Sequence, residues 1–269
     1  MKRTPATLRL AIVQFSAGPD PERNLGRLEE LWPEADKQDL VALPENFLVR
    51  GGLEDYHRAA ESIPGPLTAR LARLAVRTRS WVLAGSLVER TGDRIYNTTV
   101  LFDPRGEIRA TYRKIHLFEA TLDDGTVIRE QDWYRPGVEP VLTSVGEWRA
   151  GLSICYDLRF PELFRLYSAR GADLFFVPAN FTQRTGRDHW EVLLRARAIE
   201  NQCFVVAPAQ CGVNERTGVA SYGHSLVAGP WGELLGAAGE AQEVLYAELD
   251  PALLERTRSR VAVLQHRRI

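Results

Sequence analysis

The chain has 269 residues, of which 45% are hydrophobic and 26% are charged, a composition typical of a globular protein with a sizeable core. Its 34 basic and 35 acidic residues give a net charge of -1, so no long-range field favours nucleic acid or an anionic membrane as a partner. No uninterrupted apolar segment reaches the roughly 18 residues of a membrane helix. The three cysteines form no metal-type pair, and their odd number predicts reduced thiols in the cytoplasm.

The first half of the chain alternates strand-like and helix-like segments. Asp20 followed by Pro21 predicts a helix start, because Asp caps a helix and proline fits its first turn. A second helix is predicted from the apolar spacing of Leu67, Leu71 and Leu74. Five short apolar runs predict strands: residues 8–15, 40–43, 81–88, 97–103 and 108–114. We expect the last two of these strands to form a hairpin.

The second half continues the alternation after a long segment over residues 118–140. That segment is rich in Asp, Glu and Gly, carries Trp133 and Tyr134, and is predicted to be a binding loop or a lid. A strand then leads into Cys155, and a helix follows from Pro161. Further strands are predicted over residues 173–177 and 203–207 and near Ser225 and Val244, with helices over 188–202 and from Pro251. Strands that alternate with helices indicate an α/β fold, and no linker divides residues 1–269, so we expect one domain.

Two segments of the chain are similar in sequence. Residues 40–47 and 174–181 are identical at four of eight positions, and both are apolar strands that end in Pro-x-Asn-Phe. Residues 206–210 form a weaker third copy. Coincidence between short β-prone strings is the alternative. Otherwise the repetition predicts two equivalent half-sheets whose strand ends converge on one rim, where α/β proteins place their sites.

Cys155 is the candidate nucleophile. It ends an apolar run and is followed by a turn-like segment, so a strand would carry the thiol to the rim of the sheet and the turn would expose it. The alternative is a small buried hydrophobic residue, which is the usual role of a lone cysteine. Cys203 and Cys211 adjoin another apolar strand and are expected to be structural.

A thiol needs a base, and Glu45 is the candidate. It follows a buried strand directly, and a carboxylate partly withdrawn from water is a stronger base than one in solvent. Lys114 ends another strand and would stabilise an oxyanion and lower the pKa of the thiol. Taken singly, either residue is more often an ordinary solvent-facing strand end.

Together, three segments resemble the catalytic blocks of the nitrilase, or carbon–nitrogen hydrolase, superfamily. They are Leu-Pro-Glu45-Asn-Phe, Tyr-Arg-Lys114-Ile-His-Leu-Phe and Ser-Ile-Cys155-Tyr-Asp-Leu-Arg-Phe-Pro-Glu, in the superfamily's order. The resemblance implies that Glu45 is the general base, Lys114 the oxyanion stabiliser and Cys155 the nucleophile. Glu130 matches the family's second glutamate, which would orient Lys114.

The same resemblance implies further properties. The fold would be a four-layer α-β-β-α sandwich, and the protein would be a homodimer or higher homo-oligomer with residues 251–269 at or near the interface. A cysteine nucleophile with a glutamate base needs no metal and no cofactor. The partner would be a small-molecule amide, with neither nucleic acid nor membrane.

Residues 185–203 and 221–225 resemble, more narrowly, the branch that contains deaminated glutathione amidase and ω-amidase. That resemblance implies hydrolysis of a 2-oxoglutaramate-type amide. Trp133 and Tyr134 depart from the branch, which has smaller or more polar residues there. Five residues near Cys155 are candidates for substrate contact: Tyr156 through its N–H, Arg159 through a substrate carboxylate, and Asn180, Phe181 and His189.

Structural roles compete at four of these positions: a salt bridge at a helix start for Arg159, core or turn positions for Asn180 and Phe181, and a helix surface for His189. The competing functions are an N-carbamoyl amino acid amidohydrolase, a nitrilase, and a non-catalytic scaffold on the same fold. Three catalytic residue types retained together favour an enzyme over a scaffold.

Overall fold

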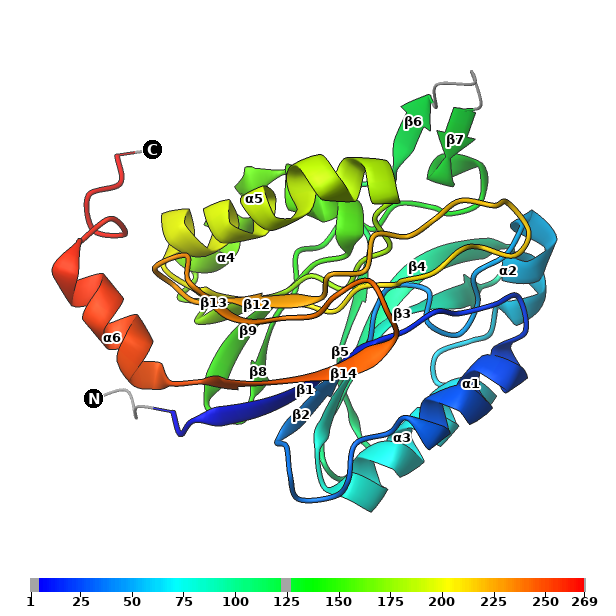
Figure 1. Cartoon of the computed structure of the whole chain (residues 1–269), viewed down its shortest axis with the longest axis horizontal. Coiled ribbons are helices and arrows are strands. Elements are labelled where there is room, and N and C mark those ends of the chain that lie inside the picture. Colours follow the sequence, from blue (N-terminus) through cyan, green and yellow to red (C-terminus); the bar gives the residue numbers. More distant parts are fainter. Residues whose placement is uncertain (1–4, 122–126, 269) are drawn as a thin grey trace.

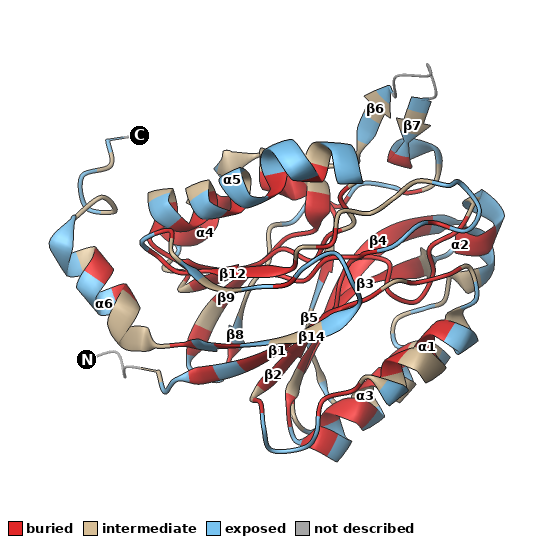
Figure 2. Cartoon of the chain, in the orientation of Figure 1, coloured by how far each residue is buried: buried red, intermediate tan, exposed pale blue. Residues whose placement is uncertain are grey.

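The computed structural model describes residues 5–121 and 127–268. Two six-stranded sheets lie face to face between two layers of helices, with α1 and α3 on one side and α4 and α5 on the other (Figure 1). This is the four-layer α-β-β-α sandwich that the sequence resemblance implied. Buried residues concentrate in the two sheets and on the helix faces turned toward them (Figure 2).

The first sheet has the strand order β14-β1-β2-β3-β4-β5. Its strands are β1 (Leu8–Gln14), β2 (Leu40–Ala42), β3 (Trp81–Thr91), β4 (Arg94–Phe102), β5 (Ile108–Arg113) and β14 (Glu243–Leu249). β1, β2 and β3 are parallel, and β4 and β5 form the predicted hairpin. The helices of this half are α1 (Pro21–Glu30), α2 (Leu53–Ala59) and α3 (Pro66–Thr78).

The second sheet repeats the arrangement with the order β13-β12-β11-β10-β9-β8. Its strands are β8 (Leu142–Val145), β9 (Trp148–Leu152), β10 (Leu174–Phe176), β11 (Phe204–Ala207), β12 (Leu226–Ala228) and β13 (Leu234–Ala237). β9, β10 and β11 are parallel. The helices α4 (Pro161–Ala169) and α5 (Gln183–Asn201) cover it, and α6 (Pro251–Arg260) follows β14.

The ends of the strands converge between the two sheets, as the sequence repetition predicted. Asn180, which follows β10, donates its backbone N–H to Oε2 of Glu45, which follows β2, over 2.8 Å. Gln210, in the third copy, donates from Nε2 to the backbone carbonyl of Glu45 over 3.0 Å. The repeated segments therefore share one rim.

Local signals explain the helix boundaries. The Asp20 carboxylate accepts the N–H groups of Glu22 and Arg23 and starts α1 as predicted. The helix predicted over 188–202 begins earlier, at Gln183, because the Thr182 side chain accepts the N–H of Thr185 and caps it. Polar residues fill this first turn, so apolar periodicity alone places the start too late.

The segment predicted as a loop over residues 118–140 is more ordered than expected. It contains the paired strands β6 (Glu119–Thr121) and β7 (Val127–Arg129) and the 3₁₀ turn η1 (Glu130–Asp132). Residues 122–126 of that prediction lie outside the described residues. The short elements α2, β8 and β13 were also not predicted, because none is long enough to establish a period. Over the described residues, no helix is both long and apolar enough to cross a membrane.

Candidate active site

A strained turn presents Cys155. β9 ends at Leu152, and Cys155 opens the 3₁₀ turn η2 (Cys155–Arg159) with φ 47°, in the left-handed region that costs a non-glycine residue energy. Its N–H donates to the carbonyl of Pro178 over 2.9 Å, which ties the turn to the end of β10. The side chain is 7% exposed. Strain of this kind persists where the surroundings enforce it, as they do at active sites.

Glu45 reaches the same place from the first sheet. A Cβ at Gly85, in the irregular part of β3, would lie only 2.0 Å from the carbonyl oxygen of Pro44, so glycine there lets the chain pass close to β3. The Glu45 carboxylate is 2% exposed. Its Oε1 accepts the amide of Asn97 over 2.9 Å, and its Oε2 accepts the Asn180 N–H. Donors from both halves of the molecule therefore fix this carboxylate.

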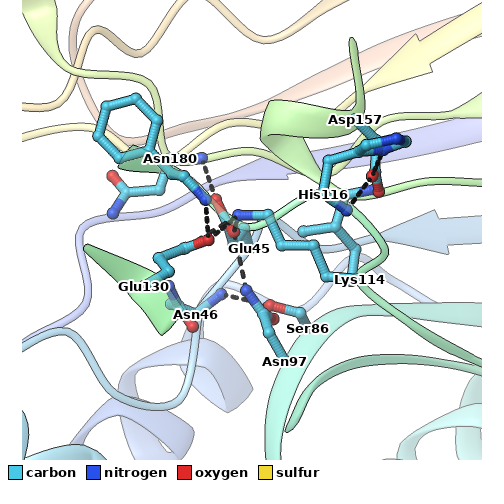
Figure 3. A network of polar contacts seen from close by, with 12 residues as sticks. Glu45, Asn46, Ser86, Asn97, Lys114, His116, Glu130, Asp157 and Asn180 are labelled. Carbon is cyan, nitrogen blue, oxygen red and sulfur yellow. Dashed lines mark hydrogen bonds and ion pairs between the residues drawn. The ribbon is translucent and has the colours of Figure 1, made fainter. Parts of the chain in front are cut away.

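Lys114 joins Glu45 to Glu130 in a buried ion cluster (Figure 3). Its Nζ lies 2.9 Å from Oε1 of Glu45 and 2.7 Å from Oε2 of Glu130, and the Lys114 side chain is 1% exposed. Glu130 Oε2 also accepts the N–H of Phe118 over 2.8 Å. Two carboxylates and one ammonium thus share a site from which water is largely excluded.

The surroundings set the charge states of this cluster. Burial alone would lower the pKa of Lys114, but the Glu130 and Glu45 carboxylates outweigh it and hold that pKa well above its usual value. Burial raises the pKa of Glu130, and the Lys114 charge offsets this only in part. Lys114 therefore remains an ammonium at neutral pH.

Burial dominates the protonation of the Cys155 thiol. Burial, reinforced by the Glu45 carboxylate, raises the pKa of Cys155 well above its usual value, although Lys114 and the Asn180 N–H lower it in part. The predicted lowering of the pKa by Lys114 is therefore present, but burial and the Glu45 charge outweigh it. A protonated thiol becomes a nucleophile only when a base removes its proton.

Asp157 connects the Cys155 turn to the segment around Lys114. Its carboxylate is fully buried and accepts the Ile154 N–H over 2.8 Å and the Tyr112 hydroxyl over 2.7 Å. It also accepts the His116 N–H over 3.0 Å and lies 2.7 Å from the His116 ring nitrogen Nδ1 (Figure 3). One carboxylate therefore fixes the spacing between the two sides of the site.

Asn180 is oriented by a chain of polar side chains. Its Oδ1 accepts the Ser221 hydroxyl over 2.6 Å, and Ser221 in turn accepts a hydrogen bond from the buried Arg50 guanidinium over 2.6 Å. Asn97, Asp157 and Arg50 were missed as supports of the site. The only sequence signal was their polar character at the ends of, or within, otherwise buried segments.

The cluster lies at one side of a cavity of about 470 Å³. The sequence candidates that line it are Glu45, Lys114, Glu130, Cys155, Tyr156, Arg159, Asn180 and Phe181. His189 does not line the cavity but is exposed, with Nδ1 3.4 Å from a guanidinium nitrogen of Arg159. The structure thus brings together all the candidates except His189, which contacts one of them from outside.

Arg159 has no carboxylate partner among the described residues, so the alternative of a salt bridge at the helix start is wrong. Its guanidinium lies over the rings of Phe181 and Tyr156, 5.4 and 5.8 Å from their centroids. In the described part of the chain, no group of three or more His, Cys, Asp or Glu side chains is arranged to hold a metal ion.

The chain belongs to the carbon–nitrogen hydrolase family, whose model matches residues 9–259. It is 42% identical to deaminated glutathione amidase of Synechocystis sp. over 96% of this chain and 97% of that protein. It is 36% identical to omega-amidase NIT2 of Bos taurus over 98% and 96% of the two chains. These matches define the chain as an enzyme of the carbon–nitrogen hydrolase class.

Solved structures give the same result. A carbon–nitrogen hydrolase superfamily protein of Xanthomonas campestris, with an arsenic adduct in its active site, superposes with a TM-score of 0.88 at 30% identity over 98% of both chains. An amidase of Nesterenkonia sp. AN1 superposes with a TM-score of 0.77 at 26% identity over 100% of this chain and 96% of that one. In that amidase, a Glu-to-Gln variant carries the acetamide moiety of fluoroacetamide on its active-site cysteine.

Proposed function

We propose that this protein is an amidase that hydrolyses a small carboxylate-bearing amide through a thioester on Cys155. The observation that carries the proposal is the placement of Cys155 against the buried Glu45–Lys114–Glu130 cluster in one cavity. A protonated thiol, a fixed carboxylate and a permanent cation are the groups that acyl transfer from an amide requires.

Acylation begins with proton transfer. Glu45 accepts the thiol proton as Cys155 Sγ attacks the amide carbonyl carbon, which avoids a standing thiolate beside two carboxylates. The oxyanion is stabilised by Lys114 Nζ, which has three N–H donors and directs the others to the two glutamates. The Tyr156 N–H is the second donor, since the turn at Cys155 presents it. Removing one such donor typically costs about 3 kcal/mol in the barrier.

Glu45 also acts in the breakdown of the tetrahedral adduct, where it serves as the general acid. Glu45 returns the proton to the leaving nitrogen, because an amide anion is too poor a leaving group. The C–N bond breaks and leaves a thioester. Glu45 then activates water, which adds to the thioester, and the acid and the free thiol are released. Glu130 keeps Lys114 charged and in position throughout.

The position of Arg159 is evidence that the substrate carries a carboxylate on its acyl part. Arg159 provides the guanidinium that lines the cavity, and its aromatic neighbours Tyr156 and Phe181 hold it without neutralising it. The relatives named deaminated glutathione amidase and omega-amidase make 2-oxoglutaramate-type acyl groups the first to test. Asn180 and Phe181 would contact the same part of the substrate.

A substrate panel tests this proposal. We expect turnover of 2-oxoglutaramate-type amides, and replacement of Arg159 by methionine should raise KM about tenfold to a hundredfold while changing kcat little, because a charge-assisted hydrogen bond is lost. Steady-state kinetics with carboxylate and methyl-ester forms of one amide measures this. Equal KM values for both forms in the wild type would contradict the role of Arg159. Carbon dioxide among the products would instead indicate an N-carbamoyl substrate.

We further propose that the chain is one carbon–nitrogen hydrolase domain that acts as a cytoplasmic homodimer. An apolar face on α5 and the β12–β13 turn supports the dimer: Val192, Ile199 and Trp231 are 67, 49 and 53% exposed. Arg260, at the end of α6, lies over the Trp231 ring, so residues after Pro251 adjoin this face. Sedimentation equilibrium should give twice the 30.2 kDa of one chain; a single-chain mass at micromolar concentration would contradict it.

A further inference from the structure

Part of the cavity lining is formed by the aromatic rings of Tyr56, Trp133 and Tyr134, which we call the aromatic wall. The rings of Tyr56 and Trp133 stack with centroids 5.4 Å apart, and Tyr134 meets Tyr56 edge-on at 6.1 Å. Tyr56 and Tyr134 are 4% and 2% exposed. The wall is therefore rigid and largely dry, and none of the catalytic steps above uses it.

The wall and Arg159 belong to opposite halves of the molecule. Tyr56 and Tyr134 pack with Val88 and Ile95 of the first sheet and with Val49, which follows β2. Phe181, beneath Arg159, follows β10 of the second sheet and packs near Cys155, which follows β9. A substrate long enough to contact both therefore reaches across the cavity from one half of the molecule to the other.

The position of Glu45 indicates which part of the substrate faces the aromatic wall. The nitrogen that leaves must lie at Glu45, the group that protonates it, and Glu45 is on the side of the first sheet, as the wall is. The acyl chain then extends the other way, toward Arg159. A carboxylate at the wall would face the negative charges of Glu45 and Glu130, both of which act on Tyr56 and Tyr134. The wall therefore suits an uncharged group on the leaving amine.

We propose that the aromatic wall is a subsite for the leaving amine, and that the substrate is a secondary amide whose nitrogen carries a flat apolar group. This inference rests on the proposed function and specifies its substrate class. The C–N bond that breaks releases a primary amine, which takes the proton from Glu45, and water supplies the hydroxyl group of the acid. Ammonia is then not the product of the preferred substrate.

The test compares 2-oxoglutaramate, which is a primary amide, with its N-benzyl derivative. We expect the wild type to prefer the N-benzyl amide about tenfold or more in kcat/KM, the range typical for filling an apolar pocket. Trp133→Ala should reduce this ratio about tenfold, and Trp133→Phe should restore part of it. Tyr246→Ala, which removes an exposed aromatic ring on β14, is the matched control and should leave the ratio unchanged.

Binding separates failure of this inference from failure of the proposed function. The N-benzyl amide should bind Cys155→Ala in a calorimeter about tenfold more tightly than Cys155→Ala/Trp133→Ala. If no amide is hydrolysed but this difference appears, the proposed function fails and the subsite remains. If the wild type prefers the primary amide, or Trp133→Ala reduces turnover of both amides equally and the binding difference is missing, the subsite is overturned.

Discussion

Replacement of Cys155 by alanine will abolish amide hydrolysis and leave the protein folded. The loss in kcat should be on the order of 10⁴-fold or more, because removing a nucleophile removes the covalent route altogether. The side chain is small and buried, so its truncation should cost only about 1 kcal/mol in the free energy of unfolding. Product formation in a coupled assay and urea unfolding measure the two effects.

Cys203→Ala is the matched control, since Cys203 is also a buried free thiol but lies in the core at the start of β11. It should retain wild-type turnover at a comparable stability cost. Full activity in Cys155→Ala, or equal losses in both variants, would show that Cys155 is not the nucleophile.

Replacement of Lys114 by methionine should reduce activity strongly and should be the most damaging of these changes to stability. It leaves the Glu45 and Glu130 carboxylates buried without their shared cation, which typically costs about 3–5 kcal/mol. The pKa of Glu130 is already raised in the wild type and should rise further. A carboxylate with a raised folded-state pKa loses stability as pH rises, so the defect should be larger near about pH 8 than near about pH 5.

Two variants separate charge from fold in this prediction. Lys114→Met/Glu130→Gln removes one of the unpaired charges and should recover part of the stability but none of the turnover. Lys37→Met removes a surface lysine paired with Glu34 and should change neither property by much. Urea unfolding of Lys114→Met that matches the wild type at both pH values would contradict the account of the ion cluster.

The sequence predicts the layers and the main site residues because both depend on strong local signals. Apolar runs such as residues 40–43 and 203–207 are buried on both faces, and the repeated Pro-x-Asn-Phe segments mark where strands reach the common rim. Glu45, Lys114 and Cys155 each follow a strand closely, so strand direction alone brings them near each other.

The rest of the site depends on contacts between distant segments. Asp157 is 45 residues from Tyr112, and Arg50 is 171 residues from Ser221, so no local pattern shows that they pair. The raised pKa of Cys155 likewise follows from burial between two sheets rather than from its neighbours in sequence. The polar turn after Thr182 and the short strands β6 and β7 lack the periodicity that sequence analysis detects.

Mass spectrometry of the protein quenched in acid during turnover tests the central claim most directly. The proposed chemistry predicts an added mass equal to the substrate acyl group, located by peptide mapping on Cys155 and absent from Cys155→Ala. An acyl group on a different residue, or continued release of acid by Cys155→Ala, would contradict it.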